Sequence, residues 1–134
     1  MNNVRVFHVL VILTFTIYVA WFCFPYLPSY LSEYEQDLVA HGGYGADLPI
    51  DDVLFYGTFF GLVLIATLGL YFFQNWARHL FLALSLLDLA ITPFSGFIVQ
   101  PPIDGLFFMI NLLLDGAILA MAYLSPLSAS FKRN

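Results

Sequence analysis

Charged side chains are scarce in this sequence. Lysine and arginine supply four of its 134 residues and aspartate and glutamate supply nine, which gives a formal net charge of -5. Nucleic-acid-binding proteins need basic patches that neutralise phosphates, so this composition excludes that class. A soluble domain is typically about 25% charged, whereas this chain is 10% charged. The low charge argues against a water-soluble domain.

Cysteine is scarcer still, because Cys23 is the only one. A single cysteine excludes an internal disulfide, a CxxC redox pair and a Cys-based zinc site. Its aromatic, apolar surroundings favour an inert buried thiol. The three histidines are too far apart to share one metal, and His41 with Glu35 or Asp37 is only a weak candidate. We predict no metal site and no cofactor.

Apolar residues dominate instead, at 61% of the chain. A chain this short cannot bury so much apolar surface in a core of its own, so lipid has to solvate the remainder. A membrane-spanning helix needs about 20 mostly apolar residues. Four segments have that length and composition: about 6–24, 53–73, 80–99 and 106–124. The short connections 74–79 and 100–105 make sequential helices antiparallel neighbours.

The placement of charge predicts the orientation, since basic residues gather on the cytoplasmic side of a membrane. Four spans place every basic residue on one side: Arg5, Arg78, Lys132 and Arg133. Most acidic residues then fall on the other side: Glu33, Glu35, Asp37, Asp47, Asp51, Asp52 and Asp104. Three or five spans would split the basic residues. We therefore predict an all-α membrane protein, one domain of residues 1–134, folded as an antiparallel bundle of four transmembrane helices. Both termini are cytoplasmic, and the location is the bacterial inner membrane.

The long first connection, 25–52, lies outside the membrane in this topology. Residues Ser29 to Ala40 can form a short helix, with Ser29 as its N-cap and Gly42 just past its end. We expect this helix to lie on the outer surface. Its predicted contact residues are Tyr30, Glu33, Tyr34 and Asp37.

Two carboxylates, Asp88 and Asp115, lie near the middle of the third and fourth predicted spans. Their similar depth lets them face each other. An acidic group at that depth costs about 2.5–3.5 kcal/mol, so something must offset it. The acids can be protonated, they can accept hydrogen bonds from Ser85, Thr92 or Asn111, or a cation or a partner's basic residue can complete the site.

These polar residues recur at helical spacing and predict an intramembrane polar site that faces the bundle interior or a partner. Three interpretations stay open: a polar clasp between two helices, a docking site for another membrane protein, and a proton or cation site. Thr92 also precedes Pro93, which we expect to kink the third span.

Small residues form a second pattern. Gly57 and Gly61 make a small-xxx-small motif in the second span, and Gly116 lies in the fourth. Glycine lets helix backbones approach closely. We predict that these glycines pack helices together, within the chain in preference to a homo-oligomer.

No catalytic pattern is present, because the sequence lacks both a nucleophile beside a recognisable base and a phosphate-binding glycine loop. With its turn Trp76-Ala77-Arg78, the four-span architecture resembles that of small bacterial inner-membrane proteins. Its general build, apart from any motif, also resembles that of small membrane immunity proteins. We therefore expect a non-enzymatic protein that binds another protein in or at the bilayer. An immunity protein against a membrane-active toxin and an accessory subunit of a membrane complex are two versions. The alternative is a proton- or cation-coupled transporter or channel component that uses the aspartate pair.

Overall fold

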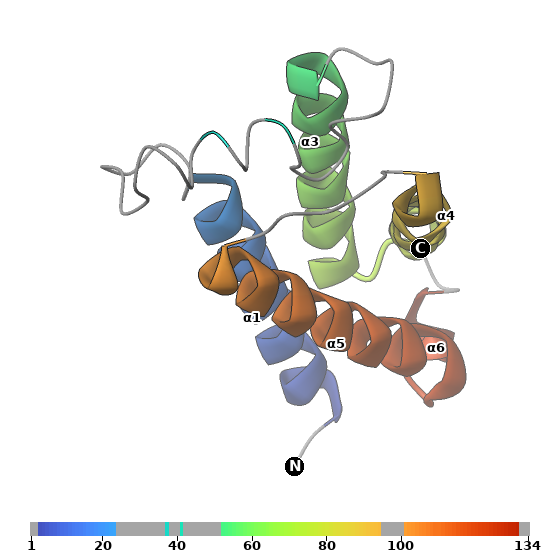
Figure 1. Ribbon diagram of the computed structural model, residues 1–134. Coiled ribbons are helices and arrows are strands. Elements are labelled where there is room, and N and C mark those ends of the chain that lie inside the picture. Colours follow the sequence, from blue (N-terminus) through green and yellow to red (C-terminus); the bar gives the residue numbers. More distant parts are fainter. Residues whose placement is uncertain (1–2, 24–36, 38–40, 42–51, 95–100, 132–134) are drawn as a thin grey trace.

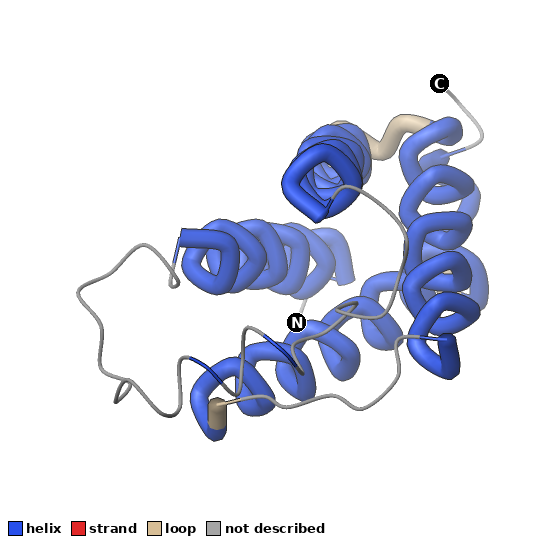
Figure 2. Tube along the Cα trace, turned by 45° about the horizontal axis from the view of Figure 1, so that its top comes forward, coloured by secondary structure: helices blue, strands red, loops and turns tan. Residues whose placement is uncertain are grey.

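Helices make up the ordered elements of the chain. A computed structural model describes residues 3–23, 37, 41, 52–94 and 101–131, and these residues contain helices and no strand (Figures 1 and 2). The elements are α1 (Asn3–Cys23), α3 (Asp52–Tyr71), α4 (Asn75–Ile91), the 3-10 turn η2 (Thr92–Phe94), α5 (Pro102–Leu124) and α6 (Ser128–Phe131). The predicted all-α class is confirmed over the described residues.

Three of the helical segments are long and apolar enough to cross a membrane. They are α1, Asn75–Phe94 (α4 continued by η2) and α5. At about 1.5 Å per residue, the 21 residues of α1 match a hydrocarbon core about 30 Å thick. In α3 the described apolar stretch, Gly57–Tyr71, is shorter.

The helix boundaries correct two predicted connections. Helix α4 already begins at Asn75, so most of the expected turn 74–79 is helical. Helix α5 begins at Pro102, where proline is well tolerated because the first helical N–H needs no partner. At Pro93 the α-helix has given way to η2, since proline cannot continue the hydrogen-bond ladder. The segment 95–99 and the outer helix, apart from Asp37, lie outside the described residues.

The turn between α3 and α4 is held by backbone hydrogen bonds. The N–H of Gln74 donates to the carbonyl of Gly69 at 2.9 Å, and that of Phe73 donates to Leu70 at 3.0 Å. This is a Schellman ending, which places one residue in the left-handed conformation. Phe73 takes that position with a φ of 54°.

Helix α5 packs mainly against α1, although α4 precedes it in the sequence. Helix α1 also contacts α3, and α3 packs along α4, whereas α4 and α5 share fewer contacts. Figure 1 shows α5 lying across α1, and α4 lying beyond α3, away from α1. Helices α4 and α5 do contact each other, as expected of sequential spans, but the more extensive contact of α5 is with α1.

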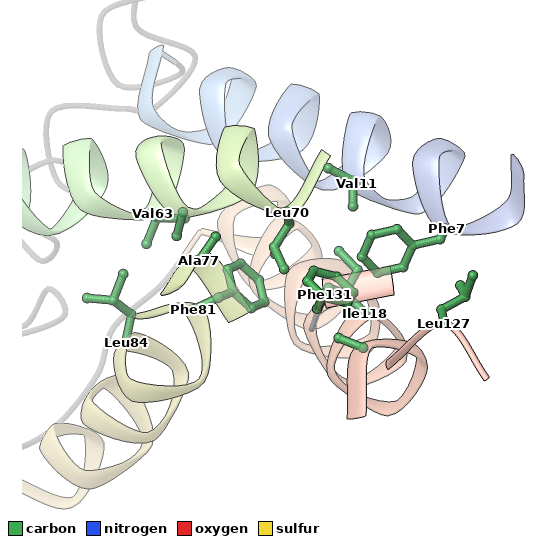
Figure 3. Close-up of a cluster of buried hydrophobic side chains, with 12 residues drawn as sticks. Phe7, Val11, Val63, Leu70, Ala77, Phe81, Leu84, Ile118, Leu127 and Phe131 are labelled. Carbon is green, nitrogen blue, oxygen red and sulfur yellow. The ribbon is translucent and has the colours of Figure 1, made fainter. Parts of the chain in front are cut away.

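The buried core gathers where several chain segments meet (Figure 3). The ring of Phe7 stacks on Phe73 with 5.4 Å between centroids and meets Phe131 edge-on at 5.8 Å. The rings of Phe73 and Phe131 lie 5.1 Å apart. We call these three residues the aromatic cluster. It joins the start of α1, the α3–α4 turn and α6 at one end of the molecule.

Candidate functional site

Helices α1 and α5 pack against each other, and each carries a stripe of buried or half-buried side chains. Phe7 lies near Phe131 while Tyr18 reaches Asp115, so the two helices run in opposite directions. The stripe on α1 is Phe7, Val11, Thr14 and Tyr18, and the stripe on α5 is Asn111, Asp115, Ile118 and Ala122. Both have the same helical spacing, so in antiparallel helices we expect Thr14 at the level of Asp115 and Tyr18 at the level of Asn111. The apolar members lie at one end and the polar members at the other.

A hydrogen bond connects the polar members. The hydroxyl of Tyr18 donates to Oδ2 of Asp115 at 2.7 Å. Long helical side chains lean toward the N-terminus of their own helix, which carries the Tyr18 ring toward the level of Asp115. The Asp115 side chain is 9% exposed, so this bond is formed away from the surface of the chain.

Four further polar atoms lie buried around this bond. They are Oγ1 of Thr14, Nδ2 and Oδ1 of Asn111, and Oδ1 of Asp115. Within the described part of the chain none of them has a hydrogen-bond partner. Thr14 is 0% exposed and Asn111 is 4% exposed. Buried polar groups in proteins are nearly always hydrogen-bonded, so this concentration singles out Thr14, Tyr18, Asn111 and Asp115. We call them the polar cluster.

Asp88 lies close to the polar cluster, but the hydrogen bond to Asp115 comes from Tyr18. Asp88 is half-buried on α4 and near enough to interact electrostatically with both Tyr18 and Asp115. The hydroxyl of Ser85 donates to the carbonyl of Phe81 at 3.0 Å, and that of Thr92 donates to the carbonyl of Asp88 at 2.9 Å. Both hydroxyl protons thus bond the backbone of α4.

Of the predicted polar site, Asn111 and Asp115 lie together in the polar cluster, Asp88 lies near it, and Ser85 and Thr92 bond their own helix. Thr14 and Tyr18 were missed by the sequence analysis. Their signal is weak but present: two polar residues four apart in the first span, with the spacing of Asn111 and Asp115.

The predicted packing glycines face open space. A Cβ added at Gly57, Gly61 or Gly116 would meet nothing within 4 Å. The close approach occurs instead at Gly69, where an added Cβ would lie 2.5 Å from the Cβ of Ala77 and 3.0 Å from the Trp76 ring. Gly69 therefore lets α4 fold back on α3. The sequence pattern favours packing within the chain, but no described residue packs closely on these three glycines. Packing against another molecule stays a prediction.

The remaining candidates are at the surface. Asp37 and His41 are exposed and form an ion pair, with 3.3 Å between His41 Nδ1 and Asp37 Oδ1. Tyr30, Glu33 and Tyr34 lie outside the described residues. No group of three or more His, Cys, Asp and Glu that could hold a metal occurs in the described ranges. Cys23 is exposed at the surface of the chain, in contrast to the buried thiol expected.

A buried arginine lies beside the aromatic cluster. Arg78 is 8% exposed, and its guanidinium carbon lies 5.1 Å from the Tyr123 ring centre and 5.6 Å from that of Phe131. The flat guanidinium group interacts favourably with ring faces. The Tyr123 hydroxyl also lies 3.0 Å from Nδ1 of His79. These contacts fasten the start of α4 to the end of α5 and to α6.

No known protein family matches this chain, and neither a curated protein nor a solved structure has significant similarity to it. Its function must be argued from its own residues.

Proposed function

We propose that the chain is a four-span inner-membrane protein with cytoplasmic termini that binds another membrane protein inside the bilayer. The topology is supported by the aromatic cluster, which gathers the start of α1, the α3–α4 turn and α6 at one end. Four crossings bring these three segments to the same side of a membrane. The basic residues Arg5 and Arg78 belong to that end, as the positive-inside rule requires on the cytoplasmic side.

The observation that carries partner binding is the open space at Gly57, Gly61 and Gly116. Between helices in lipid, association depends on close packing at small residues because there is little hydrophobic driving force. On α3 the glycines share their outer face with exposed apolar side chains, Leu54, Leu62, Ile65 and Leu68. We propose that a transmembrane helix of the partner packs along this face, as in an immunity protein bound to a membrane-active toxin or in an accessory subunit.

The test is recovery of the partner from native cells after cross-linking and extraction in mild detergent. Gly61→Leu fills the face and should abolish recovery while leaving the thermal stability of the purified chain unchanged. Ala83→Leu introduces the same side chain at an exposed position of α4 and should recover the partner as the unmodified protein does. Recovery with Gly61→Leu, or no partner with the unmodified chain, would contradict the proposal.

The polar cluster favours a second candidate, a component of a proton- or cation-coupled transporter. Buried polar residues inside spans are costly and commonly mark ion paths. Here Asp88→Asn and Asp115→Asn should abolish ion flux into proteoliposomes. An unmodified protein that carries no flux would remove this candidate.

A further inference from the structure

We infer that the polar cluster between α1 and α5 binds a small monovalent cation such as Na⁺. This inference deepens the second candidate function by naming the ligand and its site. It needs neither transport nor the protein partner, because it concerns binding within a single chain.

The available atoms are the first argument. Oδ1 of Asp115, Oδ1 of Asn111 and Oγ1 of Thr14 are buried oxygens without a hydrogen-bond partner in the described ranges. The Tyr18 oxygen keeps its lone pairs after donating its proton to Asp115. Hard cations prefer such carboxylate, amide and hydroxyl oxygens. The amide nitrogen of Asn111 is a donor and takes no part.

Placement is the second argument. The equal spacing of the two stripes predicts Thr14 opposite Asp115, and the Tyr18–Asp115 bond fixes the register of the two helices. Asn111 lies one turn before Asp115 on the same buried face of α5, and helical side chains four residues apart are neighbours. The oxygens of the two helices therefore converge on one buried region.

Charge is the third argument. Asp115 forms no ion pair within the described part of the chain, and the Arg78 guanidinium is held over Tyr123 and Phe131. Asp88 adds a second carboxylate within electrostatic reach. A single proton on Asp115 serves only one acceptor oxygen, whereas a cation is coordinated by several oxygens at once and also compensates a charged carboxylate. A monovalent ion matches the single charge of the Asp115 carboxylate, whose Oδ1 has no hydrogen-bond partner among the described residues.

The experiment measures Na⁺ binding to the purified protein in lipid nanodiscs. Radioactive Na⁺ binding and thermal unfolding are followed while NaCl replaces choline chloride at constant ionic strength. We expect saturable binding and a rise in unfolding temperature that follows the same binding curve. Asp115→Asn should weaken binding about tenfold or more, equivalent to about 1.4 kcal/mol.

Two threonines on α1, one buried and one exposed, provide a matched pair of variants. Thr14→Val removes a buried oxygen and should weaken Na⁺ binding severalfold. Thr16→Val is the matched control, because Thr16 is exposed and donates to the Ile12 carbonyl at 2.8 Å; it should bind Na⁺ unchanged. If Asp115→Asn fails to fold, the threonine pair decides the question.

The inference is overturned if Na⁺, K⁺ and Li⁺ all fail to bind saturably, or if Asp115→Asn or Thr14→Val binds as tightly as the unmodified protein. The two proposals fail separately. Gly61→Leu should lose the protein partner and keep Na⁺ binding, whereas Thr14→Val should keep the partner and lose Na⁺ affinity.

Discussion

Phe73 shows how a single residue can be held against its own backbone preference. Its φ of 54° lies in the left-handed region that favours glycine, at a cost of about 1–2 kcal/mol for other residues. Its ring packs between Phe7 and Phe131, which offsets that cost. The Schellman turn and the aromatic cluster therefore depend on the same residue.

Substitutions at Phe73 separate the two effects. Phe73→Ala loses the ring contacts and keeps the backbone strain, whereas Phe73→Gly loses the ring and relieves the strain. Both should be less stable than the unmodified protein, and Phe73→Gly should be about 1 kcal/mol more stable than Phe73→Ala. Denaturant unfolding in detergent measures the difference. Equal stability of the two variants would show that the strain carries no cost.

Tyr18 supplies the donor of the side-chain hydrogen bond between α1 and α5. Tyr18→Phe removes the donor to Asp115 and leaves a further buried oxygen without a partner. The expected loss of unfolding free energy is about 0.5–2 kcal/mol. Tyr123→Phe is the control, because its bond to His79 is exposed and should contribute less. A loss for Tyr123→Phe equal to that for Tyr18→Phe would count against a special role for the buried bond.

At the scale of elements, the α3–α4 hairpin depends on the missing side chain of Gly69. Gly69→Ala places a Cβ 2.5 Å from that of Ala77, and overpacking of this kind typically costs about 1–3 kcal/mol. Gly61→Ala meets open space and should change stability by less than about 1 kcal/mol, in the stabilising direction given alanine's higher helix propensity. Thermal unfolding of the two variants in the same detergent checks both expectations. Similar effects at both positions would contradict the close approach at Gly69.

Helix existence could be predicted from the sequence, but helix pairing could not. Apolar runs of sufficient length located all four long helices, since lipid solvation imposes that length. Which helices touch depends on the match between stripes far apart in the sequence. Helix α5 packs against α1, where the Tyr18 hydroxyl donates to Asp115. Depth alone predicted that Asp88 and Asp115 lie near each other, and they are close enough to interact electrostatically. It missed Tyr18 as the donor to Asp115.

Glycine roles were harder to predict for the same reason. A small-xxx-small motif shows that two helices can approach closely, but it does not identify the partner. The motif at Gly57 and Gly61 has open space around it, whereas the isolated Gly69 lies under the Trp76 ring. Its position beside a tight turn decides this, because α4 folds back over the last turn of α3.

At the scale of the whole molecule, side chains from every long helix pack together at one end of the structure. Arg78 lies over Tyr123 and Phe131, and the Phe131 ring in turn contacts Phe7 and Phe73. His8 adds a contact between Nε2 and the Tyr71 carbonyl at 3.2 Å. If this end is cytoplasmic, the α3–α4 turn and the C-terminus must lie on the same side of the membrane, opposite the connection 25–52.

Cysteine labelling tests that arrangement. Cys23→Ser gives a background without cysteine, because Cys23 is the only one, and single cysteines are then introduced as Asp47→Cys, Gln74→Cys and Asn134→Cys. A membrane-impermeant maleimide applied to intact spheroplasts should label only the Asp47→Cys protein, since the other two sites are expected on the cytoplasmic side. Permeabilised cells, in which all three should react, provide the accessibility control. If Asn134→Cys and Asp47→Cys are labelled from the same side, the chain does not cross the membrane four times with both ends in the cytoplasm. Asp88 and Asp115 would then no longer be expected at the same membrane depth.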